Sequence, residues 1–132
     1  MSLSEIRLIK LKDIPPEIIS EGKMTRLIFP DKSNAYYFGG FIGDSLVCLT
    51  CLIINKDRAA SIKSNFTMKE YRGEGYFTEL NKYCLKYARE NGVRRILLNC
   101  LKDSVNIHLK AGARVWKTTK AIIWMVYPEG SF

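Results

Sequence analysis

The chain has 132 residues, of which 47% are hydrophobic, and it carries a formal net charge of +8. This length and composition predict one α/β domain over residues 1–132 with its own hydrophobic core. No stretch approaches the roughly 18–20 apolar residues of a membrane-spanning helix. Charged residues also interrupt the apolar positions near the N-terminus, which argues against a signal peptide. We therefore expect a cytoplasmic protein without a membrane partner.

The positive charge is dispersed along the chain. It permits an anionic partner, such as a nucleic acid or a multiply charged small molecule. No lysine- or arginine-rich run of the kind found in nucleic-acid-binding segments occurs. The sequence by itself therefore argues against a nucleic-acid partner.

The four cysteines do not predict a metal site. Cys48 and Cys51 have the Cys-x-x-Cys spacing of zinc sites. Residues 45–55, however, predict a strand, in which side chains three positions apart point to opposite faces, and the chain has a single histidine. We expect Cys48, Cys51, Cys84 and Cys100 to be reduced and buried, and we expect no metal.

The N-terminal region predicts a strand and then a short helix. Residues 5–11 have the alternation of a strand. Asp13 is placed to cap a helix with a Pro-Pro pair in its first turn, and Gly22 is placed to end it. Residues 23–34 are irregular, with room for a second short helix.

An antiparallel meander follows. Its three predicted strands cover residues 35–42, 45–55 and 59–68. Gly43-Asp44 and residues 55–58 supply the two turns, and Gly39-Gly40 indicates a β-bulge.

The second half begins with an amphipathic helix over residues 76–91. Its hydrophobic stripe recurs at three- and four-residue spacing and consists of Phe77, Leu80, Cys84 and Ala88. Gly92 ends the helix, and residues 93–100 predict a buried strand. A strand, a helix and a strand in this order imply a right-handed parallel crossover.

The C-terminal region completes the predicted sheet. Asp103 or Ser104 caps a short helix that runs through Ala111. Residues 113–127 then form either one long strand or a hairpin that turns near residues 117–120.

The segment Tyr71–Thr78 is the strongest candidate for a functional site. It places two glycines behind an arginine at the start of the predicted helix. The first amides of a helix lack internal partners, and the helix dipole adds positive charge there. Glycines allow an anion to approach the main chain closely. The segment is therefore either a phosphate-binding loop or an ordinary connector.

This order of elements resembles the GNAT family of acetyl-coenzyme A-dependent N-acetyltransferases. The family's Gln/Arg-x-x-Gly-x-Gly/Ala loop corresponds here to residues 72–77, Arg-Gly-Glu-Gly-Tyr-Phe, and a Lys-x-Gly follows at residues 110–112. The resemblance covers nearly the whole chain. It implies a mixed central sheet with an N-terminal antiparallel meander and a splayed parallel strand pair, flanked by helices.

The resemblance also implies roles for individual residues. Main-chain amides of the loop would hold the coenzyme A diphosphate; these residues are Arg72, Gly73, Glu74, Gly75, Tyr76, Phe77 and Thr78. Pantetheine would pair with the end of the preceding strand, near Thr67 and Met68. Ser104 and His108 would face the thioester, with His108 as the general acid that protonates the departing thiolate.

Three residues depart from the family pattern. Phe77 stands where the family prefers a small residue, so its ring either narrows the approach to the diphosphate or turns into the core. Leu101 replaces an asparagine that often binds pantetheine. His108 replaces a tyrosine; an imidazole with a pKa of ~6.5 can act as an acid, or it can be a structural residue of the helix flank.

The implied reaction is acetyl transfer from acetyl-CoA to a primary amine of a small molecule or peptide by direct attack. We expect the acceptor pocket to form from residues 23–34, Tyr36, Tyr37 and the last hairpin. No residue declares itself as the general base. The alternative is a degenerate member that binds coenzyme A or another partner without turnover, and a homodimer stays open.

Overall fold

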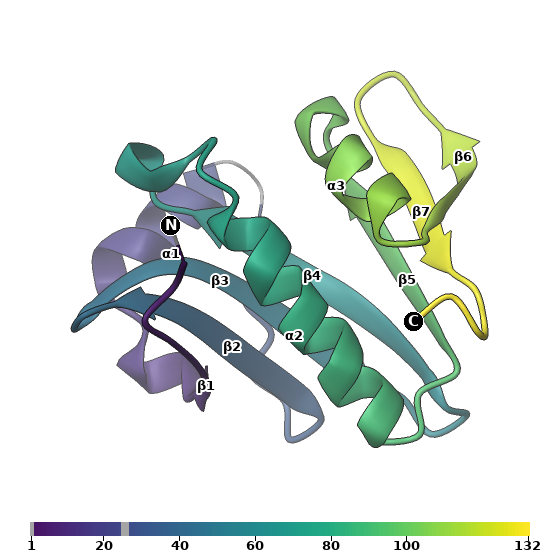
Figure 1. Ribbon diagram of the computed structural model, residues 1–132, viewed down its shortest axis with the longest axis horizontal. Coiled ribbons are helices and arrows are strands. Elements are labelled where there is room, and N and C mark those ends of the chain that lie inside the picture. The colour runs from purple at the N-terminus through teal and green to yellow at the C-terminus, as the bar shows by residue number, and fades with distance from the viewer. Residues whose placement is uncertain (1, 25–26) are drawn as a thin grey trace.

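The computed structural model describes residues 2–24 and 27–132. Its centre is a seven-stranded sheet in the order β1-β2-β3-β4-β5-β7-β6 (Figure 1). The strands are β1 Glu5–Ile9, β2 Ala35–Ile42, β3 Ser45–Ile54, β4 Ala59–Thr67, β5 Arg95–Cys100, β6 Arg114–Thr118 and β7 Ile123–Tyr127. The helices are α1 Pro16–Met24, α2 Tyr76–Glu90 and α3 Val105–Lys110, with 3-10 turns at Leu11–Asp13, Lys69–Tyr71 and Lys102–Ser104.

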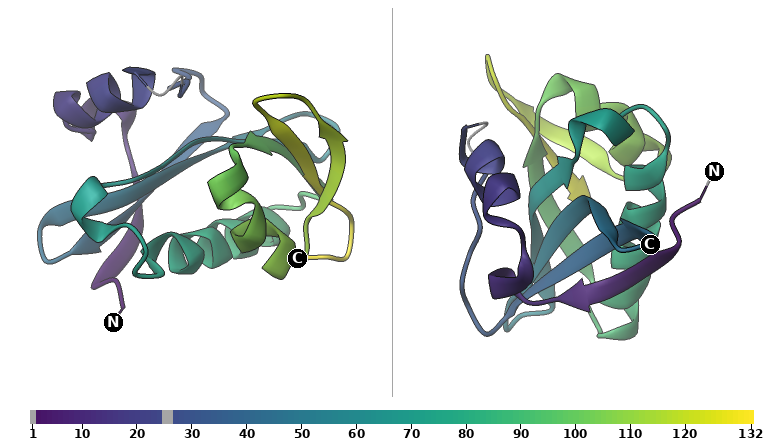
Figure 2. Two further views of the ribbon diagram at one scale, coloured as in Figure 1. Left: turned by 90° about the horizontal axis from the view of Figure 1, so that it is seen from above. Right: turned by 90° about the vertical axis from the view of Figure 1, so that its left-hand side faces the viewer.

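Helices cover the two faces of the sheet unequally. Figure 2 shows α1 on one face, and α2 and α3 on the other. We call these the α1 face and the α2 face. A hydrophobic cluster lies under each, because neighbouring strand residues point to opposite sides. The predicted mixed sheet, with its antiparallel meander and one parallel pair, is confirmed.

The buried row of α2 begins one residue earlier than the sequence predicts. Tyr76, Leu80, Cys84 and Ala88 are all at most 2% exposed and recur every four residues. Phe77 is half-buried at the edge of the same core. The predicted stripe is therefore fully buried at three of its members, and its first member, Phe77, packs against the core only in part.

The α1 face has a smaller core. Ile14 and Ile18 pack on Tyr37 and Phe66, together with other side chains of β2, β3 and β4. Gly22 does not end α1 but lies within it, where an added Cβ would come within 2.6 Å of the Phe29 ring. The glycine therefore lets the segment after the helix fold back over it.

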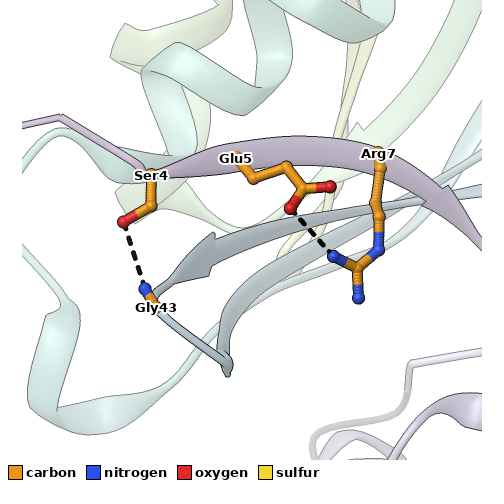
Figure 3. Close-up of polar contacts among 4 residues, drawn as sticks. All are labelled: Ser4, Glu5, Arg7 and Gly43. Carbon is orange, nitrogen blue, oxygen red and sulfur yellow. Dashed lines mark hydrogen bonds and ion pairs between the residues drawn. The ribbon is translucent and has the colours of Figure 1, made fainter.

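β1 is fastened to the meander at its first residues (Figure 3). The Gly43 amide donates a hydrogen bond to the Ser4 hydroxyl over 3.1 Å, next to the β2–β3 turn. Arg7 pairs with Glu5 at 3.0 Å and lies over the Phe41 ring. The Ser4 and Arg7–Phe41 contacts add to the β1–β2 pairing in holding an edge strand that has no fully buried residue.

The parallel pair β4–β5 separates half-way along β4. Pairing runs from Ala59 with Arg95 to Ile62 with Leu98 and then stops, while β4 continues to Thr67 (Figure 1). The β3–β4 register also shifts just beyond this point, and Ser64 has a φ of 61°. A bulge of this kind bends a strand. The predicted splay is therefore present, and the bulge is its local cause.

Four other segments also test predictions made from the sequence. Residues 113–127 form a hairpin, β6–β7, rather than one strand. Asp13 lies in a 3-10 turn three residues before α1, so it does not cap that helix. Residues 27–34 contain no helix, and residues 25–26 lie outside the described part of the chain. The bulge predicted at Gly39-Gly40 is confirmed by a register shift after Gly40.

Candidate functional site

The loop before α2 presents a row of main-chain amides. Among the described residues, none of the amides from Gly73 to Thr78 has a hydrogen-bond acceptor; the first bond of the helix runs from Glu79 to Gly75 over 3.3 Å. The Arg72 amide is engaged with Lys69, in the 3-10 turn. The predicted diphosphate-binding loop, residues 72–78, therefore offers six main-chain amides without an acceptor. These are the amides of residues 73–78, because that of Arg72 is already bonded.

The two glycines give this loop its shape. Gly73 and Gly75 have φ values of 79° and 85°, in the left-handed region. An added Cβ would meet nothing within 4 Å at either position. Glycine is thus required for backbone conformation, and the space beside both residues is open to a ligand. A helix N-terminus with successive free amides suits a multiply charged anion.

Arg72 connects the loop to the end of β4 and to α1. Its Nε donates a hydrogen bond to the Thr67 carbonyl over 2.9 Å, and its guanidinium lies over the Phe66 ring. Its terminal nitrogen is 3.8 Å from the carboxylate of Glu21. The exposed side chain therefore stiffens the passage from strand to loop and leaves its charge next to the free amides.

The end of β4 is only partly available to a ligand. The Met68 amide donates to the Val47 carbonyl, and the Thr67 carbonyl accepts the Arg72 side chain. A carbonyl has a second lone pair, so Thr67 can still accept another hydrogen bond. Ser104 is half-buried at the start of α3, and its hydroxyl has no partner among the described residues.

His108 lies in a buried polar chain. Its Nδ1 is 2.5 Å from the Tyr127 hydroxyl, which accepts a hydrogen bond from the Asn81 side chain over 3.1 Å. The His108 side chain is fully buried, and its Nε2 has no partner among the described residues. Burial lowers the pKa of His108 to about 4 and raises the pKa of Tyr127 to about 12.

This environment changes the expected chemistry of the imidazole. We expected a group that exchanges protons near neutral pH, but burial keeps the ring neutral there. With Tyr127 donating to Nδ1, the ring proton lies on Nε2. The sequence pattern did not reveal Tyr127 and Asn81, because both stand in regular elements. The only signal was the position of Asn81 on the helix, next to the predicted buried stripe of α2 but not part of it.

Phe77 lies between the loop and His108. Its ring is half-buried, and it meets the His108 imidazole edge to face with centroids 6.2 Å apart. The ring thus packs against the core of the α2 face. Of the two alternatives for Phe77, a ring that narrows the loop or a ring that turns into the core, this is the second. Leu101 is 59% exposed just after β5, so it brings no polar group to the separated strands.

On the α1 face, the segment 27–34 lies over the β4 bulge. The Ser64 hydroxyl donates to the Ile28 carbonyl, and the Tyr37 hydroxyl donates to the Pro30 carbonyl over 2.6 Å. Tyr36, in contrast, packs on Tyr87 of α2. The structure therefore brings Tyr37 to the expected acceptor side but not Tyr36, because adjacent strand residues face opposite ways. Ser64 was not predicted.

The cysteines do not take part in this arrangement. Cys48, Cys51 and Cys84 are buried, and burial raises their pKa values to about 12, 11 and 12. Cys100 is half-buried beside the Met125 sulfur, and burial raises its pKa as well. No group of three or more metal-ligating side chains occurs within residues 2–24 and 27–132.

The comparisons with known proteins identify the family. A family model described as the acetyltransferase (GNAT) family matches residues 7–113. The chain belongs to this family. Among curated proteins, none is similar enough in sequence to count as a relative.

In the part of the chain that the structure describes, no helix is both long enough and apolar enough to cross a membrane.

Solved structures of several acetyltransferases share the fold. An IAA acetyltransferase from Bacillus cereus superposes with a TM-score of 0.74 at 14% identity, covering 95% of this chain and 98% of that one. A Bacillus subtilis acetyltransferase in complex with CoA gives 0.70 at 12% identity, covering 94% and 97%. The ribosomal-protein-S18-alanine N-acetyltransferase of Escherichia coli gives 0.75 at 12% identity, covering 95% and 93%.

Proposed function

We propose that this GNAT protein transfers an acetyl group from acetyl-CoA to a primary amine. The observation that carries the proposal is the row of six unpartnered amides at the N-terminus of α2, next to the separated strands β4 and β5. A solved GNAT neighbour was obtained in complex with CoA, which supports the same donor here. The acceptor is the amine of a small molecule or a peptide.

The residues present fit such a donor. The amides from Gly73 to Thr78 bind the diphosphate, with Arg72 adding positive charge at the loop's start. Thr67 and Met68 lie where β4 has left β5, so this end of the strand lines the pantetheine path. The bound thioester supplies an activated acetyl carbonyl. We infer that the amine arrives from the α1 face and attacks this carbonyl directly.

We further propose that His108 supplies the proton to the departing thiolate from Nε2. A neutral ring can do this if Nδ1 takes up a proton at the same time. Tyr127 holds that proton 2.5 Å away, and the Asn81 amide stabilises the oxygen that loses it. The relay keeps the imidazole uncharged, in agreement with its low pKa, and leaves the negative charge on the Tyr127 oxygen. Burial raises the pKa of Tyr127 to about 12, so this oxygen takes a proton back at once, namely the proton that the attacking amine loses. The general base is not assigned.

Acetyl-CoA binding is tested with a matched pair of glycine variants. Gly75 and Gly43 both have positive φ and open space for a Cβ, but only Gly75 borders the free amides. Each Ala variant should lose about 1–2 kcal/mol of stability through left-handed strain. Acetyl-CoA at ~100 times its Kd should stabilise the wild type and Gly43→Ala by about 2.7 kcal/mol, and Gly75→Ala much less.

Thermal unfolding with and without acetyl-CoA measures both effects. No stabilisation of the wild type would contradict coenzyme binding. Equal stabilisation of both variants by acetyl-CoA would show that the loop before α2 is not part of the binding site.

Turnover separates an enzyme from a degenerate binding domain. Release of free thiol is followed with acetyl-CoA and a panel of small-molecule and peptide amines. Thiol release should fall strongly in His108→Phe and in Tyr127→Phe while acetyl-CoA binding is kept. Binding without thiol release from any amine would favour the non-catalytic reading, and unchanged turnover in both variants would rule out the relay.

A further inference from the structure

One part of the sheet has no helix over it. The hydrophobic cluster under α1 draws on β1 to β4 and includes no residue of β5, β6 or β7. Figure 2 shows α1 over the other half of the sheet, with α2 and α3 on the opposite side. The α1 face of β5, β7 and β6 is therefore bare. We call it the bare face.

The strand register identifies the side chains of the bare face. Met125 and Tyr127 are fully buried toward α2, so Trp124 and Val126 point the other way. Their partners on β5 and β6 share this side, because directly paired residues face together. The bare face consists of Arg95, Leu97, Asn99, Arg114, Trp116, Lys117, Trp124 and Val126.

Two tryptophans form an aromatic surface at one end of this face. Trp116 lies at a bulge of β6 and is 54% exposed, and its ring centroid is 6.1 Å from that of Trp124. Leu97 beside them is 39% exposed. Exposed apolar side chains that cluster in this way mark an interaction surface. Arg114 and Lys117 pair with Val126 and Trp124 across the strands, so cations border the rings.

The other end of the bare face opens into an arginine-lined hollow of about 450 Å³. Arg58, Arg94 and Arg95 line it, together with Val126 of the bare face. An adjoining hollow of about 270 Å³ adds Arg89. The Arg94 amide donates to the Arg58 carbonyl over 2.8 Å, which joins the two turns that carry these side chains. Residues far apart in the sequence thus form one basic site.

These guanidinium groups are not used inside the protein. Within residues 2–24 and 27–132, none of the four arginines forms an ion pair or a side-chain hydrogen bond. Two carboxylates, Asp57 and Glu129, share the lining, so the hollows keep a positive balance. Arginine suits phosphate because its planar fork binds two oxygens together.

We propose that the bare face binds single-stranded nucleic acid, with phosphates in the arginine hollow and bases on Trp124 and Trp116. Val126 and Trp124 are two residues apart on one strand, about 7 Å, so phosphate and base sites are adjacent. A cationic groove beside exposed aromatic rings is the usual arrangement for single strands. A second copy fits less well, since a two-fold contact would press together two copies of a face that carries Arg95, Arg114 and Lys117 and no carboxylate.

Intrinsic fluorescence tests the proposal directly. Trp116 and Trp124 are the only tryptophans of the chain, and both lie on the bare face. An oligothymidylate of about 12 nucleotides, a length within the usual site sizes, should quench their emission. Saturating CoA keeps the loop before α2 occupied throughout. Anisotropy of a labelled oligonucleotide should give a Kd on the order of 10 μM at low salt, which weakens as salt rises.

Variants assign the two halves of the site. Trp116→Ala should weaken binding by about tenfold or more through lost stacking. Arg94→Gln should lower the slope of log Kd against log salt by about 1, the loss expected for one phosphate contact. Lys12→Gln removes the same charge from the opposite end of the sheet and should bind as the wild type does. Binding of free phosphate alone, without quenching by the oligonucleotide, would reject a nucleic acid.

Two other outcomes would also overturn the proposal. One is equal weakening by Lys12→Gln and Arg94→Gln, which would indicate unspecific attraction by the net charge. The other is a dimer in light scattering whose tryptophan emission changes on dilution, which would assign the bare face to a second copy. Circular dichroism of each variant confirms that it is folded before binding is compared.

Discussion

At the scale of single residues, burial decides the chemistry of His108. The imidazole is fully enclosed, and its one hydrogen-bond partner among the described residues is the Tyr127 hydroxyl. Removing a ring from water disfavours its charged form, so the pKa falls to about 4. An unpartnered Nε2 in the same position costs free energy unless something binds to it.

The stability of the protein should therefore depend on pH through His108. Between about pH 6.5 and pH 4 the unfolded chain binds a proton there that the native protein does not bind. The free energy of unfolding should fall across this window as pH falls, by about 3 kcal/mol in total from this residue. Above pH 6.5 both states are neutral, and the contribution is constant.

Urea unfolding of the wild type and His108→Gln at several pH values measures this dependence. Carboxylates titrate in both proteins, so the difference between the two curves isolates the imidazole. Parallel curves from pH 7 to pH 4 would show that His108 is not enclosed as described.

At the scale of elements, the bulge in β4 sets the shape of the site. It lies just beyond the last β4–β5 pair, so the strand bends where it separates from β5. Ser64 occupies the bulge in a left-handed conformation, and its hydroxyl donates to the Ile28 carbonyl. One residue thus connects the separation of the strands to the segment 27–34 on the α1 face.

Replacing Ser64 should separate the contribution of its hydrogen bond to stability from the cost of its left-handed backbone conformation. Ser64→Ala removes the donor to the Ile28 carbonyl in a part-buried hydrogen bond and should cost about 1 kcal/mol. Ser64→Gly loses the same hydrogen bond but relieves the left-handed strain, so it should be less destabilised by about 1 kcal/mol. Ser61→Ala, in a regularly paired position of the same strand, is the control.

Chemical denaturation gives the ranking of these variants. Amide hydrogen exchange at Leu27, whose amide bonds Gly22, should also become faster in both Ser64 variants. A Ser64→Ala protein as stable as Ser61→Ala would contradict the role of this hydrogen bond.

At the scale of the whole molecule, the sheet has a hydrophobic core on each face, and the buried thiols are divided between these two cores. Cys48 of β3 and Cys84 of α2 lie in the core of the α2 face, and Cys51 lies in the core of the α1 face. All three are at most 1% exposed, with pKa values raised to about 11 or 12 by burial. A thiol that is both enclosed and protonated reacts slowly, because the thiolate is the nucleophile.

Reaction with a disulfide reagent should therefore report global unfolding. At most one thiol, that of the half-buried Cys100, should react early, and the other three should share one slow rate. Saturating acetyl-CoA should slow this common phase, because a ligand of the native state reduces the unfolded population. Two or more thiols in the early phase would show that one core opens independently of the other.

The sequence by itself determined the order of elements, the glycine loop and the family resemblance. These depend on neighbouring residues: hydrophobic period, turn glycines and the spacing from Arg72 to Phe77 are all local. Only the tertiary structure decided which side chains meet. Burial made His108 neutral beside Tyr127, strand alternation separated Tyr36 from Tyr37, and folding gathered Arg58, Arg94 and Arg95 from a dispersed charge pattern. Contacts between distant segments depend on packing and register, which no local pattern contains.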